Sequence, residues 1–324
     1  MYNIEDIKNT IILGDCLEVM KDIPNESIDC VITSPPYFNL RDYNIKGQIG
    51  LETTYQEFIQ KLIDIFNETK RVLKKEGTCF INLGDSYASV GKISGDIDSD
   101  VGMDIQRGRS RVTKGSYPEK SLMMVPERFA ISMIDSGWIL RNKLVWVKPN
   151  AMPESVQDRW KKAHEYIFFF VKNKKYHFDL NAIRTPHKDV SLKRAEYERG
   201  RNALGLNPSS MGKKYLENTR YMGMPARQVK LNPLGACPPD FLMVNTNCSE
   251  NDGSSEHYAT YPRDLIIPLL KSGCPKDGIV LDMFMGSGTT AVVAKHFSRN
   301  FIGIELNPEY IKIANKRLAQ EHLF

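Results

Sequence analysis

The sequence lacks long runs of apolar residues. No apolar run in its 324 residues reaches the roughly 18 residues that a membrane-spanning helix needs, and the best one, 166–171, has the length of a buried strand. The opening residues, MYNIEDIKNT, contain acids and no apolar signal-peptide core. The lack of a long apolar run excludes a membrane span, and we expect no secretory signal and a cytoplasmic protein with no membrane partner.

Cysteine is also scarce, and its spacing forms no recognised module. The six cysteines include no Cys-X-X-Cys pair, which is typical of reduced thiols in a cytoplasm and not of a disulfide framework. A zinc site is an alternative, but its spacing matches no known metal module; its ligands would be Cys237, Cys248, His257 and Cys274. We therefore expect no metal.

Net charge is small overall but concentrated in one segment. The chain carries a formal charge of +5, and its 41% hydrophobic and 26% charged residues are ordinary for a globular protein, which excludes a mainly disordered chain. Residues 184–230 contain eleven basic and four acidic side chains, a net +7, so the remainder sums to about −2. A solvated basic surface is one interpretation of this segment, and nucleic-acid binding is the other.

Short apolar runs alternate with helical periodicity along the rest of the chain. This alternation predicts an α/β fold with a mostly parallel central sheet. The expected strands are 10–13, 27–33, 78–83, 138–147, 165–171, 278–281 and 301–304, of which 10–13 is expected to be short and buried. The expected helices are 54–73, 125–136, 262–271, 289–297 and 308–318, and Glu76-Gly77 is expected to separate the first helix from the strand at 78–83. Residues 86–120 lose periodicity, which indicates either a functional loop or disorder.

A glycine-rich turn follows the strand expected at 278–281. The run DMFMGSGTT, 282–290, places glycines before a helix start, where the backbone can approach a ligand closely and free N–H groups face it. Its spacing is not the GxGxxG of dinucleotide binders, which disfavours a nicotinamide cofactor. Glu305 ends the next strand, where an acid can bind two ribose hydroxyls. The alternative is a helix cap and a solvated Glu305, but the pairing favours a bound nucleoside.

A second motif, Thr-Ser-Pro-Pro-Tyr at 33–37, follows the strand expected at 27–33. Prolines donate no hydrogen bond, so carbonyls and the Ser34 hydroxyl remain as acceptors that can grip an amino group, while Tyr37 offers a ring on which a flipped base can stack. An ordinary proline turn with a packed tyrosine is the alternative. Together the two motifs suggest methyl transfer from a nucleoside sulfonium to an amine, driven by positioning and electrostatics.

These motifs carry a family resemblance. DMFMGSGTT, TSPPY and FIGIELNPEYIKIANKRL resemble the motifs of amino-group DNA methyltransferases that use S-adenosylmethionine, and their order is similar to the beta class. The resemblance covers 10–180 and 256–324. It implies a Rossmann-like methyltransferase fold whose catalytic domain is formed by 1–183 and 256–324, with 184–255 as an inserted target-recognition region.

The resemblance also implies roles for individual residues. Ser34 and the Pro35 carbonyl would hold the target amine, with Pro36 and Tyr37 completing the catalytic loop. Asp15 and Cys16 would contact the adenine of the cofactor, Glu305 its ribose, and the glycine turn its methionine side, through Asp282, Phe284, Gly286, Ser287, Gly288 and Thr289. Met283 departs from the family, which usually has proline there. His164 and Glu165 resemble a further family motif, and a packing role for His164 is an equal alternative.

Duplex DNA is the partner that the resemblance implies. Its expected contacts are Arg107, Arg109, Arg111, Lys193, Arg194, Arg199, Arg201, Lys213 and Lys214. A partner restriction endonuclease and a homodimer are further expectations from the family.

The serine at the first position of the catalytic tetrapeptide favours cytosine N4 as the target, with adenine N6 as the alternative. Methylation of a cytosine ring carbon is excluded at family level, because that chemistry needs a cysteine nucleophile after a proline and the chain has no Pro-Cys pair. An inactive DNA-binding regulator and a methyltransferase for RNA or a protein amide remain as other classes.

Overall fold

The computed structural model describes residues 1–43, 45–88, 117–193, 195, 231–246 and 261–320. The chain divides into two units. The first consists of Met1–Asp179 and Asp240–Phe324, and the second is Leu180–Pro239. The second unit lies within the range 184–255 expected for the insert, apart from its first four residues.

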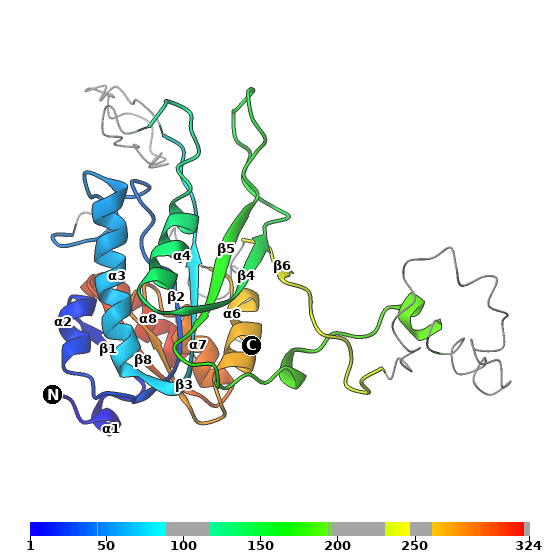
Figure 1. The fold of residues 1–324 in the computed structure, drawn as a ribbon. Helices are drawn as coiled ribbons and strands as arrows, with labels where there is room; N and C mark the ends of the chain where they lie inside the picture. The colour runs from blue at the N-terminus through cyan, green and yellow to red at the C-terminus, as the bar shows by residue number, and fades with distance from the viewer. Residues whose placement is uncertain (44, 89–116, 194, 196–230, 247–260, 321–324) are drawn as a thin grey trace, which may run out of the picture. The chain divides into compact units, whose positions relative to one another are not determined.

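An eight-stranded sheet runs through the first unit in the order β1-β8-β7-β2-β3-β5-β4-β6 (Figure 1). Only β5 is antiparallel to its neighbours among the described strands. The carboxyl ends of the other strands therefore share one edge with the start of β5, which is where open α/β sheets bind ligands. The strands are β1 (Thr10–Leu13), β2 (Ile28–Thr33), β3 (Leu73–Leu83), β4 (Ile139–Val147), β5 (His164–Val171), β6 (Phe241–Met243), β7 (Ile279–Asp282) and β8 (Asn300–Glu305).

Helices cover both faces of this sheet. One apolar cluster contains buried residues of α2, α3 and α4, and a separate cluster contains those of α6 and α7. Figure 1 shows α3 and α4 together over the same strands. This confirms the predicted α/β architecture. The helices are α1 (Ile4–Ile7), α2 (Cys16–Lys21), α3 (Tyr55–Val72), α4 (Val125–Asp135), α6 (Arg263–Gly273), α7 (Thr289–His296) and α8 (Pro308–Ala319).

Residues 166–171 show why the sheet needs helices on two sides. Successive residues of a strand point to opposite faces. Phe168 and Phe170 belong to the cluster under α3 and α4, whereas Ile167 and Phe169 belong to the cluster under α6 and α7. The continuous apolar run of β5 is therefore a strand buried on both faces.

The longest helix forms where the periodicity predicts it. Thr54 caps α3, because its Oγ1 accepts a hydrogen bond from the Glu57 backbone N–H at 3.2 Å. Phe58, Leu62 and Phe66 then follow at helical spacing and are fully buried. The amphipathic face of this helix therefore supplies much of the core on its side of the sheet.

Three strands differ from the sequence expectations, and the short helices α1 and α2 were not among the expected helices. The strand expected from residue 78 begins at Leu73, which is fully buried and pairs with Ile28, so Glu76 and Gly77 lie inside β3. The strand at 10–13, expected to be buried, lies at the sheet edge with Leu13 56% exposed. β6 was not predicted, because three residues carry too little periodicity; it pairs with β4 within the range expected for the insert.

The second unit is described in part. Its short 3-10 turn, η1 (Asn181–Ile183), precedes a bridge between Thr185 and Ala236. Arg184 Nη1 donates to the Gly235 carbonyl at 2.9 Å, which joins the two ends of this segment. Across the portion of the chain that the structure describes, no helix is both long and apolar enough to cross a membrane.

Core packing around β3 gives a test of the fold. Phe80 is 2% exposed and stacks on Phe169 with ring centroids 4.6 Å apart. Replacing it with alanine should lower the free energy of unfolding by about 3–5 kcal/mol, because a cavity replaces the ring. Urea denaturation measures this. Ile131→Ala is the matched control: its side chain is 58% exposed on α4, and it should change stability by less than about 0.5 kcal/mol. Equal losses in the two variants would contradict the packing described.

Candidate functional site

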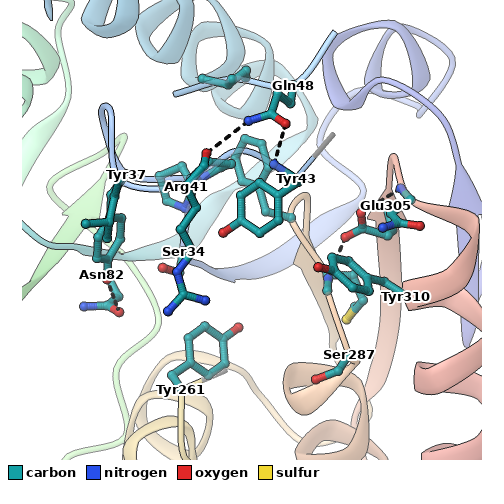
Figure 2. Close-up of a pocket in the computed structure, with 18 of the residues that line it drawn as sticks. Ser34, Tyr37, Arg41, Tyr43, Gln48, Asn82, Tyr261, Ser287, Glu305 and Tyr310 are labelled. Atoms are coloured by element: carbon teal, nitrogen blue, oxygen red, sulfur yellow. Dashed lines mark hydrogen bonds between the residues drawn. The ribbon is translucent and has the colours of Figure 1, made fainter. Parts of the chain in front are cut away.

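A cavity of about 560 Å3 lies at the carboxyl edge of the sheet. Its walls come from the turn after β1, the loop after β2, the turn after β7, the tip of β8 and the residues that flank β5. Figure 2 shows side chains from these elements converging on it, Ser34 and Tyr37 among them, with Glu305 on another wall. The fold thus brings together the two motifs that lie about 250 residues apart, since Thr33 and Asp282 are separated by 249 positions.

A buried carboxylate joins the two motifs. Asp282, at the end of β7, is fully buried and accepts hydrogen bonds of 2.7 Å from each of three hydroxyls, those of Thr33, Tyr261 and Thr290. The Phe284 backbone N–H donates to the same carboxylate at 3.1 Å. Burial raises the pKa of Asp282, although the four donors favour its charged form. Asp282 therefore ties the end of β2 to the start of α7.

Glu305 and Arg317 both hydrogen-bond to the backbone of the glycine turn. Glu305 Oε2 accepts from the Gly286 N–H at 2.7 Å and Oε1 from the Asn307 N–H at 2.8 Å. Burial raises the pKa of Glu305. Arg317, 1% exposed, donates to the Ser287 carbonyl at 2.7 Å. Glu305 lines the cavity and retains carboxylate lone pairs that can accept from a ligand.

Gly288 has a backbone role. Its φ of +84° lies in the left-handed region, and a Cβ there would lie 2.8 Å from the Ala314 Cβ. Only glycine fits this contact between the turn and α8 without a shift. Close packing behind the turn keeps Gly286, Ser287 and Thr289 at the cavity wall.

Asp15 and Cys16 line the cavity beside Glu305, because β1 pairs with β8 and the Gly14 N–H donates to the Glu305 carbonyl at 3.0 Å. Asp15 caps α2, because its Oδ1 accepts from the Leu17 N–H at 2.9 Å and the Glu18 N–H at 3.2 Å. Burial raises the pKa of the Cys16 thiol to about 12, so the thiol is neutral at ordinary pH. This corner can therefore offer carboxylate and backbone acceptors to a ligand without a reactive thiolate.

The loop after β2 places all four residues of the catalytic tetrapeptide in the cavity wall: Ser34, Pro35, Pro36 and Tyr37. The Tyr37 ring packs directly over Gly84, where an added Cβ would lie 2.5 Å from the ring Cε2. The close approach of backbone and ring sets the plane of Tyr37. An aromatic ring fixed at a cavity wall is suited to stack on a planar ligand.

The hydroxyl of Tyr37 is held by a polar network that the sequence did not reveal. It donates to Glu165 Oε2 at 2.6 Å and lies 3.1 Å from Asn82 Oδ1. Asn82 Nδ2 donates to the same Glu165 oxygen at 3.2 Å, and Lys148 pairs with the other oxygen. Burial, with the nearby Glu165 carboxylate, raises the pKa of Tyr37 well above its usual value, so its hydroxyl stays protonated and donates.

Several expected site residues do not reach the cavity. Asp282 and Gly288 support its wall from behind and are not among its lining residues. His164 is exposed, with Nε2 3.3 Å from the Tyr166 hydroxyl, whereas Glu165 lines the cavity. Lys193 is exposed in the second unit. The other expected DNA contacts lie outside the described residues, namely Arg107, Arg109, Arg111, Arg194, Arg199, Arg201, Lys213 and Lys214.

The zinc alternative gains no support from the residues described. Cys274 is buried, Cys237 is exposed in the second unit, and Cys248 and His257 lie outside the described residues. No group of three or more His, Cys, Asp or Glu side chains suited to a metal occurs in the described part of the chain.

Sequence reasoning missed a group of cavity residues that follow the catalytic tetrapeptide, above all Arg41, Tyr43 and Gln48. It also missed Lys148, Lys162 and Tyr310. Their common signal is position, because each lies near the carboxyl edge of a strand or directly after a motif. That edge could be assigned only once the strand order was known.

An α/β sheet with a glycine turn after β7, an acid at the tip of β8 and an acceptor loop after β2 defines the class of S-adenosylmethionine-dependent methyltransferases. Comparison with known proteins is more specific. The family model described as DNA methylase, of the N6 and N4 methyltransferases, matches residues 28–316. The chain belongs to this family of DNA methyltransferases, whose methyl donor is S-adenosylmethionine.

Relatives and solved structures agree with this assignment. The chain is 37% identical to the Type II methyltransferase M.SmaI of Serratia marcescens over 314 residues, which cover 96% of this chain and 90% of that protein. The structure titled PvuII DNA methyltransferase (cytosine-N4-specific) matches with a TM-score of 0.64 and 20% identity, covering 96% of this chain and 86% of that one. The M1.HpyAVI–SAM complex matches with a TM-score of 0.51 and 18% identity, covering 96% and 99%. The two structural matches confirm the Rossmann-like methyltransferase fold.

The Tyr37 network predicts coupling in activity. Tyr37→Phe removes the donor and Glu165→Gln weakens the acceptor, so each should lower kcat/KM for methyl transfer by the equivalent of about 1–3 kcal/mol. If the two act through one hydrogen bond, the double variant should lose little more than the worse single variant. A double-mutant cycle with labelled cofactor measures this.

The matched control for this cycle is Tyr166→Phe on β5, the strand that carries Glu165. The Tyr166 hydroxyl faces the exposed His164. It should leave kcat/KM unchanged. Fully additive losses for Tyr37→Phe and Glu165→Gln would show that the hydroxyl and the carboxylate act separately.

Proposed function

We propose that the protein is a site-specific methyltransferase that moves a methyl group from S-adenosylmethionine to the N4 amino group of a cytosine flipped out of duplex DNA. The observation that carries this proposal is the place of Ser34 and Pro35 in the wall of the cavity that Glu305 and the glycine turn also line. Support for cytosine comes from the serine at the first position of the tetrapeptide, and from the structural neighbour titled cytosine-N4-specific.

The cavity residues fit the cofactor. Glu305 is fixed by two backbone donors and can accept from the ribose hydroxyls, as an acid at a strand tip does in nucleotide-binding sheets. Asp15 and Cys16 would contact the adenine, and Phe284, Gly286, Ser287 and Thr289 would form the methionine side. The bound cofactor supplies an electrophilic methyl on a sulfonium whose leaving group departs neutral, so the chain need not provide a general acid.

The tetrapeptide would orient the amine. The Ser34 hydroxyl and the Pro35 carbonyl accept hydrogen bonds from the two amino hydrogens, which directs the nitrogen lone pair toward the methyl group. After the methyl group has been transferred, the cationic nitrogen would release one of these hydrogens to water as a proton. Tyr37 stacks on the base and is kept in place by Glu165 and Asn82. Asp282 keeps the strand that carries this loop next to the strand that carries the glycine turn.

Adenine N6 is the runner-up target, because the same acceptors can hold either amine. A DNA-binding regulator without activity is the candidate from another class. The complete acceptor loop and glycine turn in one cavity favour an active enzyme over a regulator.

The remaining parts of the proposal concern partners. Residues 184–230 would form the target-recognition region and residues 107–114 a further basic contact, with arginine and lysine on phosphates. Lys193 is exposed, as such a contact requires. A partner restriction endonuclease follows from the Type II naming of the relatives, a homodimer from the family resemblance, and a cytoplasmic location from the place of bacterial DNA.

The product identifies the reaction. Nucleosides from DNA of an expressing host should contain N4-methylcytosine by mass spectrometry, and Ser34→Ala should lower the single-turnover rate by about 10-fold or more with little change in cofactor affinity. The rate should fall while cofactor affinity stays, because the Ser34 hydroxyl accepts a hydrogen bond from the target amine and not from the cofactor. Finding only N6-methyladenine would replace cytosine by adenine as the target. Cofactor binding without transfer to any DNA would instead support the regulator.

Glu305 should act on cofactor affinity. Glu305→Ala removes an acceptor from the ribose and should raise the Kd for S-adenosylhomocysteine by about 10- to 100-fold, measured by calorimetry. Glu309→Ala on α8 is the control, because its side chain is exposed and pairs with Lys312 at the protein surface. An unchanged Kd in Glu305→Ala would remove Glu305 from the ribose site.

A further inference from the structure

Arg41 is a cation in the cavity that the function described so far does not use. It follows the catalytic tetrapeptide on the same loop and lines the cavity. Figure 2 shows its side chain pointing from the loop into the cavity, on the side of Ser34 and Tyr261, while Glu305 and Ser287 occupy the other side.

The other two cations of the cavity wall are already engaged. Lys148 pairs with Glu165, and Lys162 donates to the Asp85 carbonyl. The Arg41 guanidinium has no hydrogen-bond or ion-pair partner among the residues that the structure describes. Arg41 is a half-buried residue, and its guanidinium presents five donors and no acceptor, so it can bind a ligand group that offers paired acceptors in the cavity.

The backbone of Arg41 is fixed in place. Gln48 Nε2 donates to the Arg41 carbonyl at 3.2 Å, and Gln48 Oε1 accepts from the Tyr43 N–H at 2.7 Å. At the base of the loop the Asn39 N–H donates to the Gly50 carbonyl at 2.7 Å. The side chain therefore extends from an anchored position, as a specific contact requires.

The chemistry of the target base supplies the missing acceptors. On the edge that carries its N4 amino group, cytosine presents two neighbouring acceptors, N3 and O2. Adenine presents one acceptor, N1, beside its N6 amino group and then a C2–H. Cytosine can therefore accept hydrogen bonds from two N–H groups of a guanidinium fork, whereas adenine can accept from only one. Flipped bases are commonly read by hydrogen bonds along this edge.

We propose that Arg41 reads the N3 and O2 acceptors of the flipped cytosine while Ser34 and Pro35 hold its amine, which makes Arg41 a determinant of the target base. This inference rests on the proposed cytosine-N4 function. Donation to N3 draws electron density away from the amine, so the contact serves recognition and not the methyl-transfer step. The sulfonium of the cofactor is a poor alternative ligand, because it carries the same charge as Arg41.

A cycle of enzyme and substrate changes tests the proposal. The substrates are duplexes that contain the site mapped by methylome sequencing, with cytosine or 3-deazacytosine at the target position; the deaza base lacks the N3 acceptor. Arg41→Ala should lower kcat/KM on cytosine by about 10- to 100-fold. On 3-deazacytosine the wild-type enzyme cannot make the contact to N3, so its kcat/KM should already be low. Arg41→Ala should therefore lower kcat/KM on 3-deazacytosine much less than it does on cytosine.

Two further variants sharpen the result. Arg41→Lys keeps the charge but not the fork, so it should resemble Arg41→Ala on cytosine; it also carries the test if the alanine variant fails to fold. Lys276→Ala removes an exposed charge from the turn before β7, at the opposite edge of the sheet, and should behave as wild type. The Kd for S-adenosylhomocysteine should be unchanged in all three variants.

Each other outcome overturns the inference. A raised Kd for S-adenosylhomocysteine in Arg41→Ala would assign Arg41 to the carboxylate of the cofactor. If Arg41→Ala lowers kcat/KM equally on both substrates and Arg41→Lys restores it, Arg41 would be assigned to a DNA phosphate. A wild-type enzyme that makes only N6-methyladenine would overturn the proposed function and this inference together, whereas N4-methylcytosine with an uncoupled cycle would overturn this inference alone.

Discussion

The site depends on one buried carboxylate. Asp282 lies at the end of β7 and collects three hydroxyl donors from Thr33, Tyr261 and Thr290. A buried charge is tolerated only when donors surround it, and the Thr33 hydroxyl would in turn lose its hydrogen bond without it. The mutual requirement holds the loop after β2 at a fixed place relative to the glycine turn. Every proposed step needs that placement, because methyl transfer joins groups bound to the two loops.

A common arrangement recurs around the cavity: polar groups near its walls are fixed before any ligand arrives. Glu305 and Asp15 are each held by backbone N–H groups, and Tyr37 is held by Glu165 and Asn82. Groups fixed in this way lose little entropy and need little reorganisation when a ligand binds. Arg41 differs, since its backbone is anchored but its guanidinium has no partner among the described residues.

The sequence predicted most of the sheet but not its limits. Apolar runs located the central strands, because strands buried on both faces leave a continuous signal, as 166–171 do. Edge position left no such signal, so β1 was expected to be buried and β6 was missed. The start of β3 was misplaced because Gly77 looked like a stop, whereas burial of Leu73 beside Ile28 extends the strand by five residues before residue 78. Tertiary packing decided each of these boundaries.

For the site, the sequence by itself determined the chemical groups: an acceptor loop ending in Tyr37, a glycine turn and an acid at 305. Local spacing encodes these, because each motif is one strand end with the residues that follow it. Only the tertiary structure decided which distant residues join them. Asn82 and Glu165 reach the cavity because parallel strands share one carboxyl edge and β5 begins there, and that depends on a strand order that no local pattern records. It also places Asp282, an expected cofactor contact, behind the cavity wall among three hydroxyl donors.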